Sequence, residues 1–212
     1  MRQPAQRLVD RPIVLLTGFG PFPSVAENVT AQLVPDLGRR AQKAFPSHTF
    51  ITGILPTEWQ AGPDTLLTLI ARVKPALVLH FGVTRDAQGF RLEQQARNAC
   101  QFKGDALGAH PPAAGLAAEG ADCHPVTIPT RDIVNRLHNL GLPAHLSGDA
   151  GGYLCNAVLY HSLAAAAQDC RKTGFIHIPV DLSGPPLMYP DAVRGGLEII
   201  RVCLGPDCAG ES

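Results

Sequence analysis

Short, continuous apolar runs recur along this chain, and segments with apolar residues at helical spacing separate them. The clearest runs span residues 13–17, 76–81 and 174–180. A run of this length without polar alternation is typical of a strand buried on both faces, as found in parallel sheets whose strands are joined by helices. The alternation therefore predicts an α/β fold, specifically a single-domain three-layer α/β/α sandwich with a mostly parallel central sheet.

The positions of the expected elements follow from this alternation. We expect strands at 13–17, 49–55, 76–81, 144–146 and 174–180, and helices at 27–44, 57–73, 132–140, 153–167 and 190–203. Pro35 is expected to break or restart the first helix, because proline removes a helical hydrogen bond. Periodicity fails over 84–125, apart from a short strand pair expected around 90–101. Residues 1–11 are polar without periodicity and predict a flexible N-terminal extension, which leaves 12–212 as one α/β domain.

The charge balance and the cysteines limit the cellular setting. Eighteen basic and eighteen acidic side chains give a formal net charge of zero, so the chain carries no broad electrostatic surface for nucleic acid or an anionic membrane. The longest apolar run near the start, residues 13–16, is too short for a signal peptide or a membrane span. The six cysteines form no CxxC pair. We therefore expect a cytoplasmic protein with reduced thiols, and neither a nucleic-acid nor a membrane partner.

Cys155 is the cysteine whose setting favours chemistry. The glycine-rich segment 147–152 delivers it to the first turn of the helix expected at 153–167. Free amide groups and the positive end of the helix dipole would stabilise a thiolate there, and the same amides would contribute to an oxyanion hole. The alternative is an ordinary core residue, which is what a free cysteine usually is.

Two further candidates have ordinary explanations when each is taken alone. His177 lies in an apolar strand, where a histidine is more often a core or strand-end residue than a base. Glu93 by itself is typical of a solvated surface carboxylate.

The chain contains no dinucleotide-binding glycine fingerprint, P-loop, HExxH or GxSxG motif, and Cys123-His124 has no companion pair at metal-ligand spacing. We therefore predict neither a cofactor nor a metal site.

Four segments change this assessment because they occur together and in order. They are Thr17-Gly18-Phe19-Gly20-Pro21-Phe22 with Asn28 downstream, Glu93-Gln94-Gln95-Ala96-Arg97-Asn98, residues 147–156, and Phe175-Ile176-His177-Ile178-Pro179. They resemble TGFxPF, ErxAxN, SxxAGxYxCN and FIHxP, the motifs of the pyrrolidone-carboxylate (pyroglutamyl) peptidases, a family of cytoplasmic cysteine peptidases. The resemblance is collinear over about residues 13–180.

The resemblance implies a catalytic role for three residues. Cys155 would be the nucleophile, His177 its acid/base partner, and Glu93 the group that orients the histidine. The residues are compatible with these roles, because a cysteine and a histidine on successive elements of an α/β fold can meet at adjacent strand ends. The implied activity is that of a cofactor-free cysteine exopeptidase, which removes N-terminal pyroglutamate from peptides through a thioester acyl-enzyme.

The resemblance also implies a substrate pocket and an assembly. Phe19 and Phe22 would line a slot for the flat lactam ring, which carries no charged amine to desolvate. Their alternative role is core packing beneath the loop. Asn28 would position the loop or the substrate, and it is equally suited to cap a helix. The resemblance further implies homo-oligomerisation, as a dimer or a tetramer.

The chain departs from the family pattern between residues 82 and 108. Residues 82–89 replace a Gly-Gly-Arg-like stretch, and residues 100–108 lack the arginine of an RIPDN-like loop. Lys103 is the nearest cation, and lysine does not reproduce the geometry of arginine. These departures leave two alternatives open: an amidohydrolase of another small N-acyl group, and a catalytically weak homologue that binds blocked N-termini.

Overall fold

The computed structural model describes residues 11–22 and 25–205, and its centre is a six-stranded sheet of order β2-β1-β3-β8-β4-β7. Its strands are β1 (Ile13–Phe19), β2 (Thr49–Leu55), β3 (Leu77–Thr84), β4 (Phe90–Glu93), β7 (Ala144–Ser147) and β8 (Lys172–Pro179). The helices are α2 (Thr30–Ala44), α3 (Ala61–Val73), α4 (Thr130–Asn139), α5 (Leu154–Ala166) and α6 (Tyr189–Leu204). The extension expected at 1–11 lies, except for Arg11, outside the described residues.

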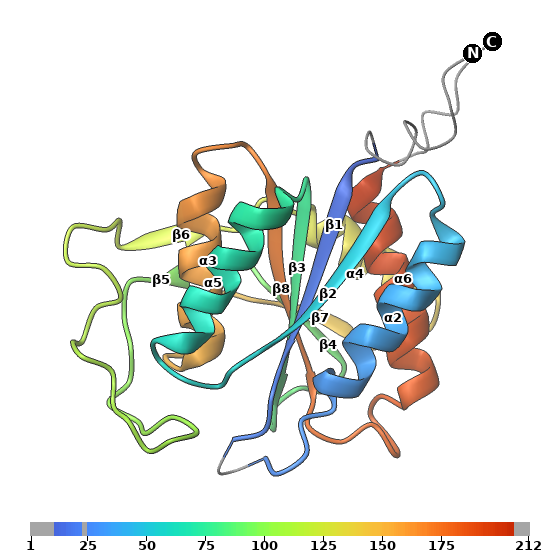
Figure 1. Cartoon of the computed structure of the whole chain (residues 1–212). Coiled ribbons are helices and arrows are strands. Elements are labelled where there is room, and N and C mark those ends of the chain that lie inside the picture. The colour runs from blue at the N-terminus through green and yellow to red at the C-terminus, as the bar shows by residue number, and fades with distance from the viewer. Residues whose placement is uncertain (1–10, 23–24, 206–212) are drawn as a thin grey trace, which may run out of the picture.

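The helices cover both faces of the sheet, which confirms the three-layer α/β/α architecture. Helices α3 and α5 pack together on one face, and α2, α4 and α6 cover the other (Figure 1). Two buried clusters correspond to the two faces. One gathers Leu16, Leu79 and Ile176 with the apolar sides of α2, α4 and α6, and the other gathers Leu15 and Phe175 with those of α3 and α5. No helix among the described residues is long and apolar enough to span a membrane.

The sheet is mostly parallel, as expected, but it contains one antiparallel junction. Strands β2, β1, β3 and β8 run parallel, β4 lies antiparallel to β8, and β7 is parallel to β4. Arg91 on β4 stands opposite His177 on β8. Residues opposite each other in an antiparallel pair share a face of the sheet. This junction therefore brings β4 side chains to the histidine.

The strand pair expected around 90–101 is wrong in its pairing. Two short strands do form there, but β4 enters the central sheet, and β5 (Gln95–Arg97) pairs instead with β6 (Cys123–Pro125). The reason is burial, because Phe90 and Leu92 are fully buried within the cluster beneath α4 and α6. Local periodicity carries no information about which distant strand supplies the pairing edge.

The break expected at Pro35 is also wrong, because α2 runs without interruption from Thr30 to Ala44. Proline lacks the N–H that would bond to the carbonyl four residues earlier. The helix tolerates this loss since Leu33, Val34 and Leu37 are completely buried against the sheet. Most helical stability in proteins comes from packing of an apolar face, and here that packing outweighs the local preference.

Candidate active site

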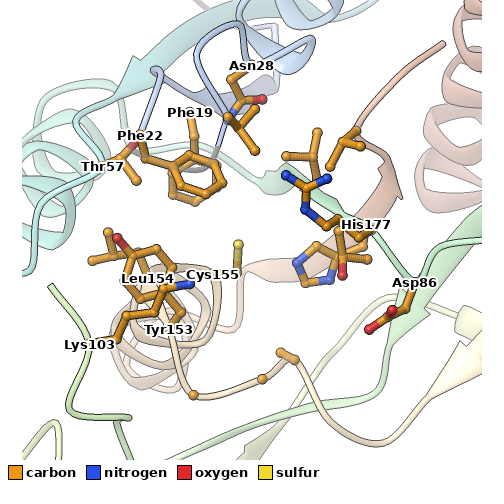
Figure 2. A pocket seen from close by; sticks show the side chains of 18 of the residues that line it. Phe19, Phe22, Asn28, Thr57, Asp86, Lys103, Tyr153, Leu154, Cys155 and His177 are labelled. Carbon is orange, nitrogen blue, oxygen red and sulfur yellow. The ribbon is translucent and has the colours of Figure 1, made fainter. Parts of the chain in front are cut away.

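A cavity of about 450 Å³ opens at the carboxyl ends of β1, β3 and β8, beside the start of α5. Figure 2 shows the sulfur of Cys155 pointing into it, with His177 to one side and Phe19, Phe22 and Tyr153 to the other. Active sites of open α/β sheets lie outside the carboxyl ends of the strands. The loop after β7 also contributes, through Asp149 to Gly152, although β7 runs opposite to β1, β3 and β8.

Cys155 occupies the first turn of α5, as the sequence predicts. The chain enters the helix through a turn in which Gly151 has a φ of +80°, a conformation that favours glycine. Tyr153 then precedes the helix with an extended backbone, and no side chain among the described residues caps that end. The first-turn amides are therefore free to face the cavity. The Cys155 thiol is half-buried and lines this cavity, whereas an ordinary core cysteine would be enclosed by apolar side chains.

Glu93 and His177 meet through the antiparallel junction. His177 Nδ1 lies 2.8 Å from Glu93 Oε1, and both side chains are buried. Glu93 is 0% exposed, which excludes a solvated surface carboxylate. Because the carboxylate occupies Nδ1, Nε2 is the ring nitrogen available to Cys155. The structure thus brings together the three residues that the motifs selected.

The charge state of His177 follows from these neighbours. Burial by itself lowers the pKa of His177. The negative charge and hydrogen bond of Cys155 act in the opposite direction, as do the hydrogen bond and charge of Glu93, and together they raise the pKa to about 9. The imidazole is therefore protonated at neutral pH, with Cys155 and Glu93 as its two neighbours. A protonated imidazole beside a thiol is an arrangement that can activate a cysteine as a nucleophile.

Aromatic rings form the cavity wall on the other side of Cys155. The Phe22 and Tyr153 ring centroids are 6.1 Å apart, and Trp59 meets Tyr153 edge-on at 5.4 Å. Phe19 is 2% exposed and packs on Phe175, so it combines the two roles considered for it, as a core residue that also lines the cavity. Sequence reasoning missed Tyr153 and Trp59. Tyr153 lies within the matched cysteine motif, whereas nothing local marks Trp59.

Asn28 holds the loop that carries the two phenylalanines. Its side-chain amide donates to the Gly20 carbonyl at 3.1 Å, and its Oδ1 accepts from the Thr30 amide and hydroxyl at 3.1 and 2.8 Å. It therefore organises both the loop and the start of α2, although the helix N-cap position is Val29. Asn28 also lines the cavity.

Gly82 is another residue that sequence reasoning did not select. It stands beside His177 in the register of β3 and β8. A Cβ atom at this position would lie 2.7 Å from Phe175 Cζ and 3.1 Å from Cys155 Sγ. The absence of a side chain therefore gives the thiol its space, which is a functional reason for glycine here.

We expect Gly82→Ala to impair activity strongly, although the substitution adds only one methyl group. The added methyl must displace the Phe175 ring or the Cys155 sulfur, and overpacking of this kind costs about 1–3 kcal/mol of stability. A nucleophile displaced by a fraction of an ångström attacks its substrate more slowly, so we expect kcat/KM to fall by roughly 10- to 100-fold. Gly184→Ala is the matched control, because a Cβ there meets nothing within 4 Å. Equal kinetics for the two variants would contradict the steric argument.

Comparisons with known proteins agree on one group. A family model described as pyroglutamyl peptidase matches residues 13–183. A pyrrolidone-carboxylate peptidase of Oceanobacillus iheyensis is 31% identical over 200 residues, covering 91% of this chain and 97% of that protein. One from Pyrococcus furiosus is 30% identical over 169 residues, covering 78% and 80%. Among solved structures, the pyrrolidone carboxyl peptidase from Thermococcus litoralis superposes with a TM-score of 0.82 at 26% identity, covering 91% of this chain and 93% of that one.

Proposed function

The chain belongs to the pyroglutamyl peptidase family, cysteine-type exopeptidases that remove N-terminal pyroglutamate, and we propose that Cys155, His177 and Glu93 carry out this reaction in it. The observation that supports the proposal is one constellation. Glu93 binds the Nδ1 side of His177, Cys155 interacts with the same imidazole, and the thiol faces a cavity. Each of the three has a chemically distinct task.

In the acylation step the Cys155 thiolate attacks the carbonyl carbon that joins pyroglutamate to the next residue. The S–C bond forms, the C–N bond breaks, and the amine leaves with the proton of His177 Nε2. We propose that the uncapped first-turn amides of α5 stabilise the negative charge that develops on the carbonyl oxygen. The products of this step are a thioester, a neutral histidine and the shortened peptide.

Deacylation reverses these proton transfers. His177 Nε2 takes a proton from water, the resulting hydroxide attacks the thioester carbonyl, and the C–S bond breaks. Pyroglutamic acid is released, and the thiolate and imidazolium are restored. Throughout both steps Glu93 holds Nδ1–H, so that Nε2 always faces the reacting atoms.

The aromatic side of the cavity suits the lactam ring. Phe19, Phe22 and Tyr153 offer flat apolar faces, and the ring is flat and uncharged. We propose that Phe19 and Phe22 contact this ring and that Asn28 fixes the loop bearing them.

The proposal extends to the setting of the enzyme. We propose that residues 12–212 act as one peptidase domain, in the cytoplasm, as a dimer or a tetramer, with neither nucleic acid nor membrane as a partner. The balanced charge supports the absence of a charge-driven partner. The five cysteines among the described residues are free of disulfide bonds.

We expect kcat/KM to fall as the pH rises through about 9. The ordinary pKa of a histidine is 6.5, but the pKa of His177 is raised to about 9. The protonated imidazole that donates to the leaving amine therefore persists above pH 6.5 and is lost when the pH passes about 9. The free energy of unfolding should also fall as the pH rises. The ionic contacts of His177 contribute fully below pH 6.5, and their contribution is lost as the pH rises through about 9. The measurement is release of a fluorogenic amine from its pyroglutamyl amide across the pH range, under reducing conditions. A descending limb centred near 6.5 would contradict the assigned ion pair.

A further inference from the structure

Arg91 contacts the proposed catalytic residues but has no role in the steps above. It lies directly opposite His177 in the β4–β8 pair, and Glu93 follows two residues later on the same face. Its Nε atom is 2.9 Å from Glu93 Oε1, the same oxygen that faces His177 Nδ1. The contact is an ion pair, since its alignment is not that of a hydrogen bond. Two cations therefore share one carboxylate oxygen.

Because Glu93 is buried, its charge needs compensation, and Arg91 is the second positive charge beside it. The carboxylate is 0% exposed, and its Oε2 has no hydrogen-bond partner among the described residues. A buried charge without compensation is costly, and a carboxyl group in that situation tends to become protonated. While His177 is an imidazolium it compensates Glu93. During the lifetime of the thioester His177 is neutral, and Arg91 is then the remaining cation in contact with Glu93.

Arg91 also reaches the loop that leads to the nucleophile. Its Nη2 donates to the backbone carbonyl of Asp149, within the segment between β7 and α5. One planar guanidinium thus touches both the carboxylate that orients His177 and the loop that delivers Cys155. Lysine has a single nitrogen on a flexible stem and cannot make both contacts in this fixed geometry.

We propose that Arg91 is a positioning residue, which supplies the compensating positive charge beside the buried Glu93 side chain while His177 is neutral and ties Glu93 to the loop before Cys155. The inference rests on the proposed roles of Cys155, His177 and Glu93. Arg91 acts through Glu93 and contributes no proton to the reaction. The other charged groups lining the cavity are Arg85, Asp86, Lys103 and Asp149, and the groups acting directly on the imidazole are Cys155 from α5 and Glu93 from β4.

The test compares Arg91→Gln, Arg91→Lys and the matched control Arg97→Gln. Arg97 also lies near Asp149, 3.8 Å from its carboxylate, but it makes no ion pair with Glu93. For Arg91→Gln we expect kcat to fall by roughly 10- to 100-fold with little change in KM. Its basic pH limb should rise by about one pH unit, because Glu93 without Arg91 holds the proton of His177 more strongly.

Arg91→Lys keeps the charge but not both contacts. We expect it to retain the wild-type position of the basic limb and an intermediate kcat, and we expect Arg97→Gln to match the wild type in both. A loss of activity in Arg91→Gln without movement of the limb would overturn the electrostatic role and leave only a structural tether. An effect confined to KM would assign Arg91 to substrate binding, which also overturns the proposal.

Two measurements keep these outcomes separate from folding and from the proposed function. Thermal unfolding shows whether Arg91→Gln is folded at the assay temperature, and Arg91→Lys carries the test if it is not. Cys155→Ala is assayed in parallel. Turnover that survives in Cys155→Ala would refute the proposed catalytic residues, whereas wild-type behaviour of Arg91→Gln would refute only the inference on Arg91.

Discussion

Cys155→Ala is expected to abolish release of amine from a pyroglutamyl amide, with kcat reduced by about 10⁶-fold. In the proposed mechanism the Cys155 sulfur is the atom that bonds to the substrate, so no other group replaces it once the sulfur is gone. His177 loses Cys155 as a partner at the same time, and Glu93 then remains as the partner of its imidazole. The measurement is single-turnover and steady-state kinetics on the pyroglutamyl amide of a fluorogenic amine, with the prolyl amide as the comparison substrate.

Cys100→Ala provides the matched control for this result. Cys100 is also half-buried and free, but its thiol donates to the Ala113 carbonyl at 2.8 Å and does not line the cavity. We expect it to keep wild-type turnover. Both variants should unfold at temperatures close to that of the wild type, because each removes one partly exposed atom. Cleavage of the pyroglutamyl amide by Cys155→Ala above background, or equal cleavage of the prolyl amide by the wild type, would contradict the assignment.

The elements with a strong local pattern were predictable from the sequence. The strand expected at 49–55 matches β2, and the helix expected at 190–203 matches α6 to within one residue at each end. The helix expected at 132–140 matches α4 to within two residues at each end. Gly141 follows this helix with a φ of +72°, the left-handed conformation that is common just after a helix.

The elements that were mispredicted depend on contacts between distant residues. Pro35 stays inside α2 because the packing of Leu37 and its neighbours overrides a local preference. The partners of β4 are β7 and β8, and β8 lies more than eighty residues away in the chain; no periodicity of a single strand identifies either partner. Strand pairing is a property of the whole sheet, so the local sequence around residue 90 could not predict which strands would pair with this segment.

In the proposed site, too, some features were predictable from local motifs and others depend on contacts between distant residues. The ordered motifs selected Cys155, His177 and Glu93, and the structure places Glu93 against His177 through the antiparallel β4. The sequence also raised the absence of the family arginine after Glu93. The cavity does contain arginines, but Arg85 and Arg91 come from the segment before Glu93 rather than from the loop after it. Which positions supply the charges around a cavity depends on strand direction, which no motif records.

Glu93→Gln is the prediction that tests the electrostatic design most directly. Glutamine has nearly the same shape as glutamate, so the packing of β4 against β8 should persist. Its side chain is neutral, however, and leaves both the imidazolium of His177 and the guanidinium of Arg91 without their anion. Because the charge and hydrogen bond of Glu93 raise the pKa of His177, the basic limb of activity should move to lower pH.

We expect kcat in Glu93→Gln to fall by about 10⁴-fold, as is typical when the group that fixes a catalytic histidine becomes an amide. An amide that donates to Nδ1 would select the imidazole tautomer with its proton on Nε2, which cannot accept the proton of the attacking water. Glu198→Gln is the control, since Glu198 also pairs with two arginines, Arg136 and Arg201, but on α6 away from the cavity. If Glu93→Gln kept wild-type kcat and an unmoved limb, Glu93 would be a packing residue. The geometry argues otherwise, because a fully buried carboxylate shared by two cations is a costly arrangement for packing alone.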